Sequence, residues 1–310
     1  MSTTCLVTGG AGFIGSNLSI ALLHRGLHVR VLDNYSTGRA ENLRGYEQEI
    51  EVINGDIRSV DDVTRATKGV DVVFHQAALP SVPRSVADPL TSNEYNVTGT
   101  LNLFIGARDQ GVRRVVYASS SSVYGNTQVL PKVETMIPRP MSPYAVSKLT
   151  GEIYGRVFAE LYGLETVGLR YFNVFGPRQD PSSQYAAVIP KFITFLINGR
   201  RPTVFGDGEQ SRDFTFISDV VEANILAATT EGVGGEVFNI ACGQRISLNE
   251  LLKVLRDIIG SRLGADYTDP RPGDVKHSLA DIDKARRLLN YSPKTGVEEG
   301  LRKTVEWFKE

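Results

Sequence analysis

The 310-residue chain has few residues of the types that hold metals or form disulfides: two cysteines and four histidines. Cys5 and Cys242 form no metal-binding spacing, and so low a cysteine content suits a reducing compartment. The histidines share no ligand spacing either. We therefore expect no metal site and a cytoplasmic protein.

Long apolar runs and charge of one sign are also missing. The first residues carry no basic segment, and the run Cys5–Thr8 is far too short to span a membrane, so we expect no signal peptide and no membrane partner. Lys and Arg number 34 against 35 Asp and Glu, without basic clusters, which argues against nucleic acid as a partner. No tandem repeat and no low-complexity segment is visible. The 41% hydrophobic content is sufficient for a full core, and the length favours two lobes.

A glycine-rich turn stands near the N-terminus. The short apolar segment Cys5–Thr8 predicts a buried strand, and Gly9, Gly12 and Gly15 lead into an amphipathic helix. Such glycines let the backbone turn tightly and approach a pyrophosphate, which the N-terminus of the helix favours. The next strand, 29–32, ends at Asp33, about 20 residues after the loop, where a carboxylate binds the ribose hydroxyls. Because this acid would repel a 2′-phosphate, we predict NAD rather than NADP.

The first half alternates strand and helix patterns. Further strands are expected at 51–53, 70–74, 114–118 and 166–169, with long helices at about 89–110 and 144–162. This order predicts an α/β fold: a Rossmann-type doubly wound parallel sheet with a smaller mixed α/β substrate-binding lobe. Ligands bind at the carboxyl ends of such strands, so Asp56 and Ile57 are expected near the adenine, and Gln76, Ala77 and Ala78 beside the cofactor. His75 is interpreted as a strand-end residue near it.

A Tyr-x-x-x-Lys pair, Tyr144 and Lys148, follows the serine run Ser119–Ser122. Two residues four apart lie on one face of a helix, where the ammonium would lower the pKa of the phenol and make it a usable base. Ser142 is a suitable N-cap, Pro143 suits the first helical position, and Gly163 the end of the helix. The Tyr-x-x-x-Lys pattern alone is a weak signal, and it indicates this chemistry only together with the glycine loop.

Beyond about residue 170 the alternation stops, and glycine, proline and arginine become frequent. We expect a nucleotide-binding domain at 1–170, with a returning segment at about 214–240, and a substrate-binding lobe at 171–213 and 241–310. Arg212 and Arg271 lie in turn-rich segments of that lobe, where a guanidinium can grip a diphosphate. The alternative is that both are solvated surface residues.

Motifs along nearly the whole chain resemble the extended short-chain dehydrogenase/reductase superfamily and, within it, the NAD-dependent nucleotide-sugar 4-epimerases. They are Gly9–Gly15, Asp33–Asn34, Asp56–Ile57, Gln76–Ala78, Ser119–Gly125, Tyr144–Lys148, Arg170–Pro177, Ser211–Phe214 and Arg271–Asp274.

The resemblance implies roles for these residues. Tyr144 is the base that takes the proton of the sugar 4-hydroxyl, Lys148 binds the nicotinamide ribose, and Ser120 is the third catalytic residue. Hydride passes from C4 to tightly bound NAD and returns to the other face of a 4-keto sugar that has turned in the pocket. Sugar-nucleotide dehydratases carry an Asp-Glu pair where this chain has Ser121 and Ser122, so elimination is disfavoured.

The expected contacts form two sets. The expected cofactor contacts are Gly9, Gly12, Phe13, Ile14, Gly15, Asp33, Asn34, Ser36, Thr37, Gly38, Asp56, Ile57, Gln76, Ala77, Ala78, Asn96, Ser119, Tyr144, Lys148 and Phe172. The expected substrate contacts are Ser81, Ser120, Ser121, Ser122, Tyr144, Asn173, Ala187, Val188, Val204, Arg212, Arg271, Asp274 and Ser278.

Finer likeness points to the bacterial UDP-N-acetylglucosamine 4-epimerases of the UDP-glucose 4-epimerase family. In that family a tyrosine at the position of Ser278 restricts the pocket to unsubstituted hexoses, whereas a small residue admits an N-acetyl group. The expected substrates are UDP-GlcNAc and UDP-GalNAc, and also UDP-Glc and UDP-Gal. A uronic acid is an alternative, with Arg84 as a conceivable carboxylate partner.

Two other functions stay open: a sugar-nucleotide oxidoreductase that releases NADH, and a non-catalytic NAD-binding regulatory protein. The intact Tyr144, Lys148 and serine set argues against the second. Because the long helices carry apolar residues on more than one side, we also expect a homodimer.

Overall fold

A seven-stranded parallel sheet forms the centre of the molecule. The computed structural model describes residues 3–181, 187–270 and 275–310. The strands lie in the order β11-β6-β5-β4-β1-β2-β3, and each neighbouring pair is parallel. Their bounds are β1 (Thr4–Thr8), β2 (His28–Asp33), β3 (Glu51–Asn54), β4 (Val72–His75), β5 (Arg114–Ser120), β6 (Glu165–Tyr171) and β11 (Val237–Ile240).

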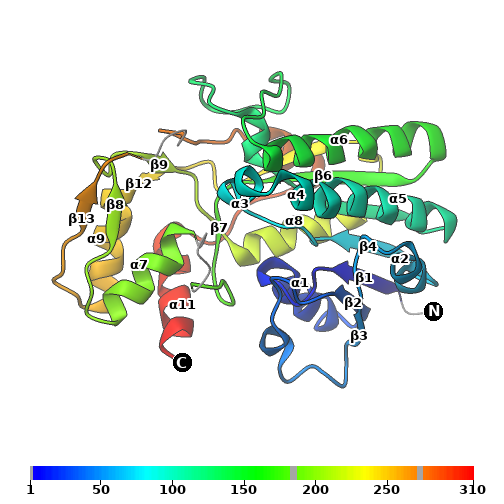
Figure 1. The fold of residues 1–310 in the computed structure, drawn as a ribbon, viewed down its shortest axis with the longest axis horizontal. Helices are drawn as coiled ribbons and strands as arrows, with labels where there is room; N and C mark the ends of the chain where they lie inside the picture. The colour runs from blue at the N-terminus through cyan, green and yellow to red at the C-terminus, as the bar shows by residue number, and fades with distance from the viewer. Residues whose placement is uncertain (1–2, 182–186, 271–274) are drawn as a thin grey trace.

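Helices cover both faces of this sheet (Figure 1). One face carries α1 (Phe13–Leu23) and α8 (Ile217–Thr229), and the other α2 (Val60–Thr67), α5 (Gly99–Asp109) and α6 (Pro143–Tyr162). The apolar side chains form two buried clusters: the one on the α2 and α5 side centres on Leu103 and Phe104, and the other, larger cluster continues into the second lobe. The doubly wound sheet predicted from the sequence is confirmed.

The boundaries differ from expectation in two places that matter. β5 runs to Ser120, so Ser119 and Ser120 are its last residues and do not lie beyond it. The helix expected at 89–110 is divided into α4 (Pro89–Asn93), a π-helical turn (Glu94–Thr98) and α5. Asn96 lies in that turn, and its side chain exchanges hydrogen bonds of 2.8 and 3.1 Å with the main chain of Leu79. A π-turn inside a helix is typical of a functional site.

The helix predicted at 144–162 is present as α6, with the expected ends. The Ser142 hydroxyl accepts a hydrogen bond from the Ala145 N–H at 3.1 Å, Pro143 occupies the first turn, and Gly163 ends the helix with φ +69°. These three residues thus fix where Tyr144 stands, in the first turn of α6.

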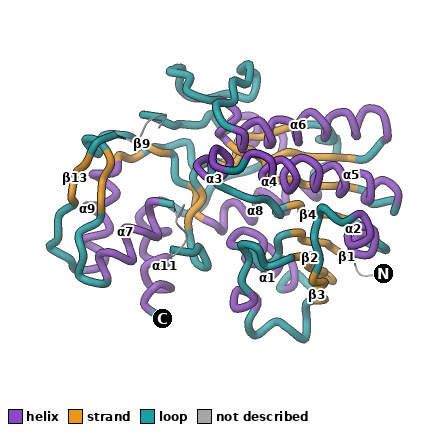
Figure 2. Tube along the Cα trace, viewed as in Figure 1, coloured by secondary structure: helices purple, strands orange, loops and turns teal. Residues whose placement is uncertain are grey.

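A smaller lobe packs beside the carboxyl ends of the strands (Figures 1 and 2). It contains α7 (Val188–Ile197), α9 (Leu248–Ile259) and α11 (Val297–Lys309), with the strand pairs β8 (Thr203–Phe205) with β13 (Asp266–Thr268) and β9 (Ser211–Arg212) with β12 (Ile246–Ser247). Short elements β7 (Val174–Phe175), β10 (Thr215–Phe216) and α10 (Asp283–Leu289) connect it to the sheet. Within the described ranges, no helix combines the length and apolar character needed to cross a membrane.

Candidate active site

The turn between β1 and α1 leaves no room for a side chain at Gly9 or Gly15. Gly9 has φ +67°, a conformation that side chains disfavour. A Cβ at Gly15 would overlap the carbonyl oxygen of Gly9, because the helix starts directly against the turn. Gly12 is the N-cap of α1 and uses its own N–H for the Gly9 carbonyl, at 3.0 Å. The first N–H groups of the helix therefore face a backbone wall without side chains, which suits a pyrophosphate.

Asp33 ends β2 beside this turn and is nearly buried, with 7% exposure. Its carboxylate accepts hydrogen bonds from the Ala11 N–H at 2.9 Å and the Tyr35 N–H at 2.8 Å. Burial raises the pKa of this carboxyl, and the backbone hydrogen bonds act in the opposite direction. Gly38 passes so close that a Cβ there would lie 2.8 Å from Asp33 Oδ2. The carboxylate is thus held in one position at the rim of the cofactor pocket.

The pocket at the carboxyl ends of the strands collects most of the predicted cofactor contacts. Those that line it are Gly9, Gly12, Phe13, Ile14, Gly15, Asp33, Asn34, Ser36, Thr37, Gly38, Ile57, Gln76, Ala77, Ala78, Ser119, Tyr144 and Lys148. Three others do not line it. Asn96 is buried under Leu79, Phe172 is fully buried in the core, and Asp56 stands behind Asn34.

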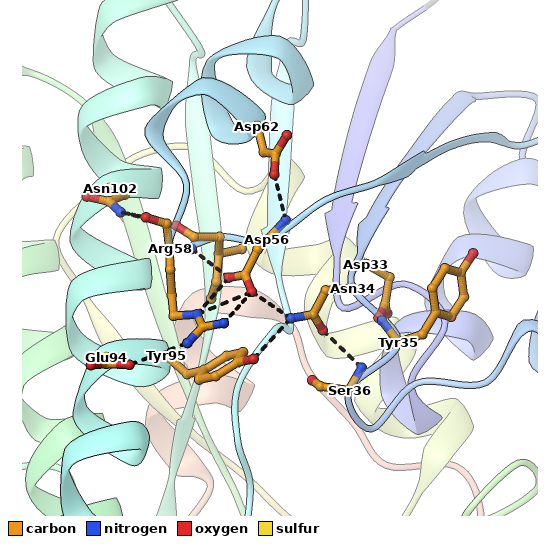
Figure 3. A network of polar contacts seen from close by, with 11 residues as sticks. Asp33, Asn34, Tyr35, Ser36, Asp56, Arg58, Asp62, Glu94, Tyr95 and Asn102 are labelled. Atoms are coloured by element: carbon orange, nitrogen blue, oxygen red, sulfur yellow. Dashed lines mark hydrogen bonds and ion pairs between the residues drawn. The ribbon is translucent and has the colours of Figure 1, made fainter.

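Asp56 belongs to a polar network at the β3 end of the pocket (Figure 3). The Asn34 side-chain amide donates to Asp56 Oδ2 at 2.8 Å and to the Tyr95 hydroxyl at 3.2 Å. Arg58 forms an ion pair with Asp56 at 2.8 Å, and its guanidinium carbon lies 3.9 Å from the centroid of the Tyr95 ring. The Arg58 ion pair and the Asn34 hydrogen bond lower the pKa of Asp56 against the effect of burial. Asp56 therefore orients Asn34, which itself lines the pocket.

Six further residues line the pocket that the sequence patterns did not indicate: Leu32, Gly55, Pro80, Tyr95, Ala118 and Tyr171. Gly55 follows β3, and Tyr171 ends β6, so the rule that ligands meet strand ends would have found both. Tyr171 exchanges hydrogen bonds with Asn224 and donates to Gln76 at 3.2 Å. Tyr95 carries no such signal, because only the π-helical turn brings it to the pocket.

Tyr144, Lys148 and Ser120 come together where β5 meets α6. The Lys148 ammonium donates to the Ala118 carbonyl at 2.9 Å and lies 5.8 Å from the centroid of the Tyr144 ring. The side chains of Ser120 and Tyr144 are hydrogen-bonded. Ser120 also accepts from the N–H of Ser122 at 3.2 Å and lies 2.9 Å, hydroxyl to hydroxyl, from it.

The pKa of Tyr144 differs from the expectation. Burial raises it, and the hydrogen bond with Ser120 only partly offsets this, so the lowering expected from Lys148 is not found. The reason is geometric, because Lys148 directs its ammonium to the Ala118 carbonyl. Burial lowers the pKa of Lys148 to about 8, which leaves the ammonium largely charged at neutral pH.

His75 ends β4, as expected, but is buried and does not line the pocket. Its Nδ1 lies 2.7 Å from the Thr8 hydroxyl and its Nε2 2.9 Å from the Thr100 hydroxyl. Burial first, and the Lys148 charge second, lower its pKa to about 3. The neutral ring thus connects β1, β4 and α5 under the cofactor pocket.

Two cavities adjoin the pocket on the side of the smaller lobe. The larger, of about 500 Å³, is mostly apolar and is lined by Ala187, Val188 and five phenylalanines. The smaller, of about 290 Å³, is lined by Ser121, Ser122 and Ser278. Asn173 and Arg212 line both, so they stand at the junction of the two cavities.

The other predicted substrate contacts have different positions. Val204 is fully buried in β8, while its neighbours Thr203 and Phe205 line the larger cavity. Ser81, with φ +108°, is the N-cap of α3 (Val82–Ala87) and accepts from the Arg84 N–H at 3.2 Å. Arg271 and Asp274 lie outside the described residues.

Comparisons with known proteins agree with this geometry. Residues 5–241 match the model of the NAD dependent epimerase/dehydratase family. The chain is 42% identical over 308 residues to the UDP-glucose 4-epimerase of Mycolicibacterium smegmatis, with 98% of each chain covered. Among solved structures, it resembles the UDP-N-acetylglucosamine 4-epimerase from Methanobrevibacter ruminantium in complex with UDP-N-acetylmuramic acid, with 44% identity, a TM-score of 0.95, and 99% and 98% of the two chains covered. It also resembles the UDP-glucose 4-epimerase of Thermus thermophilus in complex with NAD, with 38% identity, a TM-score of 0.91 and 99% of each chain covered.

Proposed function

The chain belongs to the NAD-dependent epimerase/dehydratase family as a UDP-sugar 4-epimerase, and we propose that its preferred reaction is the interconversion of UDP-GlcNAc and UDP-GalNAc. UDP-Glc and UDP-Gal are proposed as further substrates. The observation that carries the choice of sugar is Ser278, a small buried residue that lines the smaller cavity beside Ser122. A bulky side chain there would fill the space that a 2-acetamido group needs.

The cofactor pocket fits NAD on three counts. Its glycine turn leaves no room for side chains, the α1 N-terminus faces it, and Asp33 is fixed at its rim. When bound, NAD accepts a hydride from C4 of the sugar and returns it. We propose that Lys148 contacts the ribose next to the nicotinamide, and that Asn34, held by Asp56, contacts the adenosine end.

Tyr144 is the proposed base. Its phenol stands at the start of α6, in the cofactor pocket and hydrogen-bonded to Ser120, so it can take the proton of the 4-hydroxyl and later give it back. Burial raises the pKa of the phenol, so Tyr144 must lose its own proton before it acts as the base, and the positive charges of Lys148 and of bound NAD would favour that loss. Ser120 is the proposed partner that orients the sugar hydroxyl.

The serines also limit the chemistry to epimerisation. Removal of water from the sugar needs an acid and a base beside the reacting carbon. Ser121 and Ser122, which line the smaller cavity, carry hydroxyls and no carboxylate. The 4-keto sugar therefore keeps its substituents while it turns, and hydride can return to either face of C4.

The larger, apolar cavity is the proposed site of the uracil, because its phenylalanines offer flat apolar surface. Arg212 and Asn173, at the junction of the cavities, are then placed for the diphosphate. We also propose that residues 1–170, with the returning segment at about 214–240, form the nucleotide-binding domain, and that 171–213 and 241–310 form the substrate lobe.

Val146, Ile153 and Leu161 form an exposed apolar line along α6, which supports the proposed homodimer.

A substrate panel tests the proposal. Purified protein is incubated with UDP-GlcNAc, UDP-Glc and UDP-GlcA, and products are identified by chromatography while absorbance is followed at ~340 nm. We expect UDP-GalNAc to form fastest, with no net absorbance change. Net NADH release would identify an oxidoreductase instead, and a preference for UDP-GlcA would identify a uronic acid epimerase.

A further inference from the structure

Lys132 brings a second cation, besides Arg212, to the smaller cavity. It lies in the long connection between β5 and α6 and is buried, with 2% exposure. It lines the cavity together with Ser122, Ser278 and Arg212. Its own N–H donates to the Leu279 carbonyl, and its carbonyl accepts from Asp281 and Asn239. The ammonium is therefore the polar group that Lys132 can offer to the cavity.

This ammonium has few partners within the protein. It donates to the Gly125 carbonyl at a long 3.3 Å and lies 5.8 Å from the centroid of the Tyr124 ring. Within the ranges that the structure describes, it pairs with no carboxylate. An ammonium has three donors, so two are left over. Burial and the Arg212 charge together lower the pKa of Lys132, as expected for two cations beside one cavity.

Lys132 lies at the cavity proposed for the sugar and not at the one proposed for the uracil. Arg212 and Asn173 line both cavities, whereas Lys132 lines the smaller one alone. That cavity is also bounded by Ser142 and Ala145, which flank Tyr144 on α6. Because an uncompensated buried charge is costly, its retention at this point favours an anionic ligand group.

We propose that Lys132 is a substrate-binding residue whose ammonium pairs with an anionic oxygen of the nucleotide sugar, either a carboxylate on the sugar or the diphosphate oxygen next to it. The inference rests on the proposed function, since it takes the smaller cavity as the sugar site. It adds a determinant of substrate charge to the steric one at Ser278. If the carboxylate is the partner, the enzyme accepts acidic sugars as well as neutral ones.

Binding measurements on variants test this inference. Lys132→Met removes the charge at similar volume, Lys132→Arg keeps it, and Lys253→Met, on the exposed face of α9, is the control for loss of one positive charge. Calorimetry gives the Kd of UDP, UDP-GlcNAc and UDP-GlcA, and the KM is measured for each sugar that turns over. We expect Lys132→Met to weaken binding about tenfold to a hundredfold, as for a lost hydrogen bond to a charged group, with Lys132→Arg close to wild type.

The pattern of loss identifies the partner. A loss confined to UDP-GlcA identifies a sugar carboxylate, and an equal loss for UDP and both sugars identifies the diphosphate. Unchanged Kd values for all three ligands would overturn the proposal. So would a lowered melting temperature in both Lys132→Met and Lys132→Arg with unchanged affinity, which would show a structural role. Should Lys132→Met be insoluble, Lys132→Gln keeps a donor for the Gly125 carbonyl without the charge.

A failure of the proposed function can be told apart from a failure of the proposal for Lys132. If the wild type epimerises none of the three sugars, that proposal falls, while the binding of UDP and the two UDP-sugars still reports on Lys132.

Discussion

Arg170 of β6 and Glu152 of α6 form a buried two-point ion pair. The two contacts are 2.8 Å between Nε and Oε1 and 2.7 Å between Nη2 and Oε2, and the side chains are 5% and 6% exposed. Glu152 also accepts from the Ser119 hydroxyl at 2.5 Å, and Arg170 donates to the Tyr124 hydroxyl at 2.9 Å. The pair thus joins α6, the helix that carries Tyr144, to β6, and the Ser119 contact joins the same helix to β5, which ends at Ser120.

Breaking this pair is expected to destabilise the protein strongly. Glu152→Gln leaves the Arg170 charge buried without a counter-ion, which costs about 3–5 kcal/mol of the free energy of unfolding. Urea denaturation measures it. The matched control is Glu298→Gln, which breaks an exposed pair with Arg302 and should cost less than about 1 kcal/mol. Equal losses in the two variants would contradict the structural importance of the buried pair.

Tyr144→Phe is expected to abolish the reaction and spare the cofactor site. The substitution removes only the hydroxyl that is hydrogen-bonded to Ser120, so the fold and the NAD content should stay as in the wild type. We expect turnover to fall at least about a hundredfold, as for loss of a general base. The rate of epimerisation and the amount of NAD released on denaturation are the measurements. Substantial turnover in the variant would exclude Tyr144 as the base.

Ser278→Tyr is expected to change the preference for the sugar. Ser278 is buried in the smaller cavity, and a phenol there would fill space near the position proposed for the 2-acetamido group. The kcat/KM for UDP-GlcNAc should fall at least about tenfold more than that for UDP-Gal. Ser278→Ala, which keeps the space, serves as the control and should retain the wild-type ratio. An equal loss on both sugars in Ser278→Tyr would argue against selection by size.

Gly15→Ala is expected to disrupt the cofactor turn. The new methyl group would overlap the Gly9 carbonyl, and neither backbone segment can move without displacing α1. We expect purified protein without NAD and with a lower melting temperature. Gly151→Ala is the control, because Gly151 lies in the middle of α6, where alanine favours the helix. The new methyl group would lie 3.9 Å from Thr100, an ordinary contact. Retention of NAD by Gly15→Ala would show that the turn has more freedom than its geometry indicates.

Stability at low pH should depend on His75. Its pKa is about 3 in the folded chain against 6.5 for a free imidazole, so the unfolded chain takes up the proton first as the pH falls. The folded state is then disfavoured by about 1.4 kcal/mol for each pH unit between about 6 and 4. His75→Gln lacks this titration, so the stability of the wild type relative to the variant should decline over that range. A constant difference between the two proteins would mean that the ring is already charged in the fold.

Local patterns in the sequence were sufficient for part of this description. The glycine turn, Asp33 and the caps of α6 depend on neighbours along the chain, and the structure places them as expected. The interior position of Val204, the burial of Lys132 and the π-helical turn could not be predicted, because each depends on contacts between segments far apart in the sequence. The prediction that Lys148 lowers the pKa of Tyr144 was wrong because burial raises it, and burial is a property of the folded chain.

The late position of β11 in the sequence has a consequence for synthesis. β6 pairs with β5 on one side, but its other edge is completed only by β11, which is made after the strands β7 to β10 and helix α8. A nascent chain that has emerged as far as Tyr171 therefore presents an open strand edge, able to pair with other chains. The nascent chain should therefore be most prone to aggregation at this stage of translation. A fragment that stops at residue 170 should be far less soluble than one that extends past Ile240.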